Sequence, residues 1–91
     1  MKTIWKYKLE VMDRQQITMP EAAEIIHVAA VQDELCVWVK VDPMRPPETR
    51  TFVIVGTGHP IPDDVEHRHA VGTAVFELKH GPFVWHVFEV R

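Results

Sequence analysis

The feature that most constrains this chain is a side-chain period of two that is interrupted at short intervals by turn-forming residues. At Trp5, Tyr7, Leu9 and Val11, bulky apolar side chains alternate with charged ones. This alternation is typical of a strand with one buried face, whereas an amphipathic helix needs a period of 3.6. Because the strands are short and closely spaced, we predict an all-β fold. The expected architecture is a small antiparallel β-sandwich or barrel of six to seven short strands, with little or no helix.

The breaks in the alternation set the expected element boundaries. A helical turn over residues 22–26 is an alternative start to the third strand, since Pro20, Glu21 and Glu24 suit a helix N-terminus. Residues 42–50 contain three prolines and are expected to form a loop, and residues 56–72 are expected to form a polar connection. A hairpin turn is expected around residues 80–82. The expected strands cover residues 5–11, 17–19, 25–31, 35–41, 51–55, 73–79 and 83–90.

Length and charge exclude several classes of protein. A chain of 91 residues has room for a single β domain over residues 1–91. With 10 Lys and Arg against 13 Asp and Glu, the net charge of -3 argues against nucleic acid as the partner. The single cysteine excludes an internal disulfide, and Cys36 is expected to be a small buried side chain. Neither a membrane span nor the apolar region of a signal peptide is visible, so we expect a cytoplasmic protein without a membrane partner.

The apolar content predicts self-association. Residues 35–41 and 83–90 carry apolar side chains on both faces of their expected strands. One two-layer core of this size usually covers fewer apolar side chains, so we expect a homo-oligomer in which an apolar face or edge meets its copy. A well-filled barrel is the alternative.

One candidate ligand-binding site follows the fifth expected strand. Gly56, Thr57, Gly58 and His59 combine two glycines, a hydroxyl and an imidazole, which suit a small ligand with a phosphate or carboxylate. Arginine would supply charge for such a ligand, and the expected contributors are Arg14 and Arg50, with Arg45 and Arg68 as alternatives. The other interpretation is a tight strand exit in which the glycines serve turn geometry alone.

Catalytic machinery is not visible in the residues. Serine is absent, which excludes a Ser-His-Asp triad, and His86 within an apolar strand is expected to be a satisfied histidine. His67 and His69, with His59, have the residue types of a metal site, but a solvated loop is a poor place for one. We therefore expect no enzyme activity, no cofactor and no bound metal.

Several short motifs resemble a family of small, uncharacterised phage and prophage proteins, and the resemblance runs over nearly the whole chain. The motifs are Ile4-Trp5-Lys6-Tyr7, Asp13-Arg14-Gln15, Ile17-Thr18-Met19-Pro20, Val41-Asp42-Pro43, Gly56-Thr57-Gly58-His59-Pro60 and His86-Val87-Phe88-Glu89. This resemblance implies a compact, mostly β accessory protein that acts in the cytoplasm of a bacterial host.

The expected function is that of a non-enzymatic binding module. The first hypothesis is that it sequesters a small, nucleotide-like ligand and so antagonises a host defence system. A second is inhibition of a host protein through a surface or a sheet edge. A metal-dependent enzyme using His59, His67 and His69, and a virion or assembly component, are further alternatives.

Overall fold

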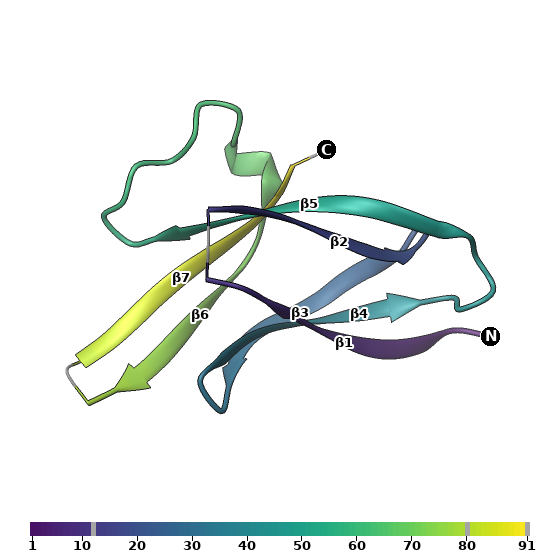
Figure 1. The fold of residues 1–91 in the computed structure, drawn as a ribbon, viewed down its shortest axis with the longest axis horizontal. Coiled ribbons are helices and arrows are strands. Elements are labelled where there is room, and N and C mark those ends of the chain that lie inside the picture. The colour runs from purple at the N-terminus through teal and green to yellow at the C-terminus, as the bar shows by residue number, and fades with distance from the viewer. Residues whose placement is uncertain (12, 80, 91) are drawn as a thin grey trace.

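The protein is an all-β sandwich of two antiparallel sheets, which confirms the predicted fold class (Figure 1). The structure is a computed structural model that describes residues 1–11, 13–79 and 81–90. In the three-stranded sheet the order is β1 (Thr3–Leu9), β4 (Glu34–Val41) and β3 (Glu24–Val31). In the four-stranded sheet it is β2 (Arg14–Pro20), β5 (Pro47–Gly56), β7 (Gly81–Val90) and β6 (Ala70–Leu78).

Several element boundaries differ from those expected from the sequence; for example, β2 begins at Arg14 and β6 at Ala70, three residues earlier than expected in each case. β1 ends at Leu9, so Val11 lies outside it. The alternative of a helix over residues 22–26 is wrong, because β3 begins at Glu24. β5 begins at Pro47 rather than Thr51, and its first four residues pair only with β2, starting with Pro47 opposite Pro20. Proline is compatible with the first position of a strand, which explains this longer β5. His80, expected in the last hairpin turn, lies outside the described residues.

The core lies between the two sheets and uses the faces that the alternation predicts. Leu35, Val37, Val39 and Val41 of β4 are almost completely buried, and they pack in one cluster with Phe52 of the opposite sheet. Cys36 is outside this cluster yet fully buried, as expected. The second apolar face of the four-stranded sheet is covered separately, as described below.

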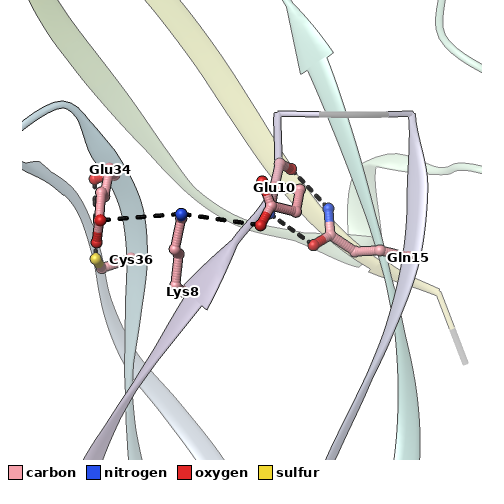
Figure 2. Close-up of polar contacts among 5 residues, drawn as sticks. All are labelled: Lys8, Glu10, Gln15, Glu34 and Cys36. Carbon is pink, nitrogen blue, oxygen red and sulfur yellow. Dashed lines mark hydrogen bonds and ion pairs between the residues drawn. The ribbon is translucent and has the colours of Figure 1, made fainter.

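The two sides of the sandwich, where the edges of the sheets meet, differ. On one side β3 packs tightly on β6: a Cβ atom on Gly72 would lie only 2.7 Å from Cγ2 of Val28. On the other side β1 and β2 belong to different sheets and are not paired with each other. Their connection is closed by Gln15, whose side-chain amide accepts from the backbone N–H of Glu10 at 2.8 Å and donates to its carbonyl oxygen at 2.7 Å (Figure 2). The side between β1 and β2 is therefore open.

The only helical element in the described part of the chain is a 3-10 turn at His67–His69. In residues 1–11, 13–79 and 81–90, no helix has the length and apolar character needed to cross a membrane.

Candidate functional site

The residues Gly56 to His59 form a reverse turn at the end of β5. Its defining bond runs from the His59 N–H to the Gly56 carbonyl oxygen at 3.0 Å, and Gly58 at the third position has φ of 88°. A type II turn requires positive φ at this position, which suits glycine. The Thr57 N–H donates to the Val84 carbonyl oxygen at 3.2 Å. Two of the backbone N–H groups expected to face an anion are therefore used within the protein.

The ring of His59 folds back over the α-carbon of Gly56. A Cβ atom at position 56 would lie 2.8 Å from His59 Nδ1 and 3.1 Å from the ring of Trp85. The two rings meet edge to face, with centroids 6.2 Å apart. Gly56 is thus required for close approach, and His59 is held against Trp85 although it remains exposed. This packing restricts the orientations of the His59 ring, and so the directions from which it could contact a ligand.

Beside this turn is a shallow hollow of about 290 Å³ on the outer face of the four-stranded sheet. Its side chains are mostly apolar, and none of the described residues that line it is lysine or arginine. His86 supplies the main polar group: its Nε2 lies 2.7 Å from Oγ1 of Thr57, and its Nδ1 lies 3.1 Å from Oγ1 of Thr73. A neutral imidazole has one donor and one acceptor, so it donates to one threonine and accepts from the other. The hollow therefore suits an uncharged group better than a phosphate. It is lined by Val55, Gly56, Thr57, Gly58, His59, Ile61, His86 and Phe88.

The structure does not bring the two expected arginines to this hollow. Arg14 forms an exposed ion pair with Asp64, with Nη2 at 2.8 and 3.0 Å from the carboxylate oxygens. The hydrogen bond from Arg14 is the main cause of the lowered pKa of Asp64. Arg50 lies six residues before Gly56 on β5, about 20 Å away along an extended strand.

Arg50 points into the interior, where its side chain forms several hydrogen bonds. Its side chain is almost fully buried, and its Nη2 donates to Oε1 of Glu89 at 2.8 Å while its Nε donates to the other carboxylate oxygen. Its Nη1 donates to the Ala23 carbonyl oxygen at 2.6 Å. Ala23 lies in the connection from β2 to β3, so this buried pair ties the two sheets together. A buried ion pair with its hydrogen bonds satisfied is expected in such a position.

The segment 57–69, called here the cover segment, is more than the solvated loop expected from its composition. Val65 is buried on an apolar cluster on the outer face of the four-stranded sheet, formed by Val53, Val55, Phe88 and Val90. His69 is only 6% exposed, and its Nδ1 accepts from the Glu66 N–H at 2.9 Å. The apolar outer face thus draws part of a polar segment onto itself. Two of the apolar side chains of residues 83–90 that suggested an oligomer, Phe88 and Val90, are packed against this cluster within one chain.

The histidines considered for a metal site are not gathered by the fold. In the part of the chain that the structure describes, no group of three or more His, Cys, Asp or Glu side chains is placed to hold a metal ion. His69 is buried, while His59 and His67 are exposed.

Sequence reasoning missed a groove on the open side of the sandwich, called here the open groove. Its volume is about 300 Å³, and it lies between β1, β2 and the connection from β4 to β5. Trp5 is 41% exposed here although its alternation predicted a core position. Tyr7 is partly buried, and its burial raises the pKa of the phenol. Three of its lining residues are prolines, but their spacing in the sequence does not indicate that they meet, because that depends on strand order. The groove is lined by Trp5, Tyr7, Thr18, Met19, Pro20, Pro43, Arg45 and Pro47.

A second apolar surface lies on the hairpin of β6 and β7, which projects from the body of the sandwich (Figure 1). Leu78 and Phe83 are 41% and 49% exposed there, and with Val11 they surround the more buried Phe76 and Trp85. Trp85 is partly buried against the core, so it lies at the boundary of the core.

Comparison with known protein families finds one that matches the chain. A model described as a domain of unknown function, DUF7352, matches residues 1–91. The chain belongs to this family. No curated protein and no solved structure matches it. The DUF7352 assignment agrees with the expected membership of an uncharacterised family, and it covers the whole sandwich including the open groove and the cover segment.

Proposed function

We propose that this DUF7352 domain is a non-enzymatic protein-binding module whose binding surface is the open groove. The observation that carries the proposal is the exposure of Trp5 beside Tyr7 in a groove at an unsealed side of the sandwich. Tryptophan and tyrosine supply much of the energy of protein interfaces because they bury a large apolar area and keep a polar group. The opposite side is closed by the contact of Gly72 with Val28, whereas the open groove lies between β1 and β2.

The resemblance to phage and prophage proteins suggests the setting of this interaction. We propose that the partner is a protein of the bacterial host, met in the cytoplasm, and that binding antagonises a host defence system. A homo-oligomer formed through the same groove is the competing use of this surface. Sedimentation of the purified protein distinguishes the two, because a groove occupied by a second copy gives a concentration-dependent dimer.

The test compares two aromatic substitutions on different surfaces. Trp5→Ala removes the central side chain of the open groove, and Phe83→Ala is the matched control on the hairpin of β6 and β7. Tagged wild-type and variant proteins are used to recover partners from bacterial lysate, after circular dichroism has established that both variants are folded. We expect a stoichiometric partner that is lost with Trp5→Ala and retained with Phe83→Ala. Retention with Trp5→Ala would refute the proposal.

A second candidate function is capture of a small ligand in the hollow beside Thr57. The polar contacts of His86 among apolar walls favour it. Since none of the described lining residues is lysine or arginine, the hollow favours an uncharged ring, such as the base of a nucleotide-like ligand, over a phosphate. Thermal shift measurements with matched nucleosides and nucleotides test this directly. Stabilisation by a nucleoside that disappears in Thr57→Val, which keeps the shape and removes the hydroxyl, would support ligand capture. No stabilisation by any member of the panel would count against it.

A further inference from the structure

The free edge of β1 borders the open groove and has unused backbone hydrogen-bonding capacity. β1 is the outermost strand of its sheet and, within the described part of the chain, pairs only with β4, from Thr3 opposite Val41 to Leu9 opposite Leu35. The other edge of β1 therefore presents the N–H and C=O groups of alternate residues along this seven-residue strand. An extended segment can add to such an edge as a further strand, with its backbone giving affinity and its alternate side chains giving specificity.

The two faces of β1 differ in the side chains that an added strand would meet. Trp5 and Tyr7 point toward the groove, where Met19 and Pro20 of β2 form part of the wall. Lys6 lies on the opposite face of the strand, as the strand period of two requires. In an added strand, every second side chain would therefore enter the open groove, and the side chains between them would lie beside the lysines of β1.

β1 carries two lysines, Lys6 and Lys8, and no acidic residue, in a chain of net charge -3. Among the described residues, Lys6 is exposed and forms no ion pair. Lys40 lies between Ile4 of β1 and Glu24 of β3, and acidic side chains also line the hollow that it shares with Lys2. Lys8 lies 3.9 Å from both Glu10 and Glu34, at half-exposed positions where such contacts are weak (Figure 2). The face beside β1 thus has positive charge available for a partner.

This charge pattern disfavours a second copy of the chain on the same edge. If two β1 strands paired, lysines of one copy would lie beside lysines of the other, and like charges on neighbouring strands repel. Lysines on an edge strand are a common means of preventing pairing between identical copies. Acidic side chains at alternate positions would instead complement Lys6 and Lys8.

We propose that β1 accepts an extended strand of the partner protein in which apolar and acidic residues alternate. The apolar residues enter the open groove beside Trp5 and Tyr7, and the acidic residues lie beside Lys6 and Lys8. One strand register satisfies both faces, because both patterns have a period of two. This inference rests on the proposed function and names the chemistry of the partner segment.

Synthetic peptides of eight residues test the inference on the full chain. The probe alternates valine and glutamate, one control has the same composition in two blocks, and another alternates valine and lysine. Affinity is measured by titration calorimetry, and the site is mapped by amide chemical shifts. We expect the alternating acidic peptide to bind, to perturb residues 3–9 and to bind more weakly as salt increases. The block peptide should bind at least about tenfold more weakly, since it cannot satisfy both faces.

A charge-reversed variant completes the test. The double variant Lys6→Glu with Lys8→Glu should bind the alternating acidic peptide at least about tenfold more weakly than wild type does. It should bind the lysine peptide instead. The affinity of the double variant Lys6→Gln with Lys8→Gln for the acidic peptide should lie between those of wild type and the reversed variant. Unfolding curves establish that all variants are folded. The inference would be overturned if the alternating and block acidic peptides bound equally well, or if charge reversal left their affinities unchanged. Amide chemical-shift changes that fall outside residues 3–9 would also overturn it.

The lysate experiment separates this inference from the proposed function. A partner that is lost with Trp5→Ala but unaffected by charge reversal leaves the open groove as the binding surface and overturns the acidic strand. A partner unaffected by either change overturns both.

Discussion

Substituting Gly72 by alanine tests how tightly the sealed side of the sandwich is packed. The new Cβ would lie 2.7 Å from Cγ2 and 2.9 Å from Cβ of Val28, which is itself buried on β3. Overpacking of this kind costs about 1–3 kcal/mol. Alanine would recover about 0.4–1 kcal/mol through the lower entropy of the unfolded chain. We expect a net loss of about 1–2 kcal/mol in the free energy of unfolding.

The assay is urea unfolding together with a thermal melt. For a domain of this size, the expected loss lowers the melting temperature by roughly 4–16 °C. Gly58→Ala is the matched control, because nothing lies within 4 Å of a Cβ there and the positive φ alone is strained. The loss in free energy of unfolding caused by Gly58→Ala should therefore be the same with and without Val28→Ala.

The double variant of Gly72→Ala and Val28→Ala shows whether the two positions are coupled. Val28→Ala removes the atom at 2.7 Å but retains the Cβ at 2.9 Å, so relief should be partial. The double variant should be more stable than the sum of the single effects by at least about 0.5 kcal/mol. A Gly72→Ala protein as stable as wild type, or additive single effects, would refute the argument that the sheets seal by close contact here.

Three further predictions concern charged and titratable groups. Arg50→Met should lower the free energy of unfolding by about 3–5 kcal/mol, because it removes the guanidinium from the buried Glu89 carboxylate. Adding Glu89→Met should recover part of this loss in urea unfolding, and a double variant no better than Arg50→Met would contradict the reasoning. Arg14→Gln should raise the pKa of Asp64 toward its ordinary value of 3.8 in a carboxyl NMR titration, with an unchanged value as the contrary result. The stability from this pair is present at neutral pH and is lost as pH falls below 3.8 through the lowered pKa. Tyr7 is the single tyrosine, and its raised pKa predicts that tyrosinate absorbance develops above pH 10.0 in the folded protein. Its contribution to stability is present below pH 10.0 and is lost at higher pH, so tyrosinate formation at pH 10.0 or below would argue against its burial.

The sequence by itself determined the fold class and the faces of individual strands. Local alternation placed Leu35, Val37 and Val39 on the core face of β4, and it is independent of the neighbouring strands. The burial of Cys36 and the turn at Gly58 were predictable for the same reason, since they depend on the character of a few adjacent residues.

Only the tertiary structure decided what surrounds each strand. The composition of the sequence suggested Arg50 as a ligand contact, but its partner is Glu89, 39 residues away, and β5 and β7 bring the two together. Likewise, alternation predicted that Trp5 would be buried, whereas the separation of β1 and β2 into different sheets leaves it exposed. Sheet pairing joins segments far apart in the chain, and the side-chain pattern of one strand does not specify its neighbour. The open groove and the free edge of β1 therefore arise from strand order, which the alternation alone does not encode.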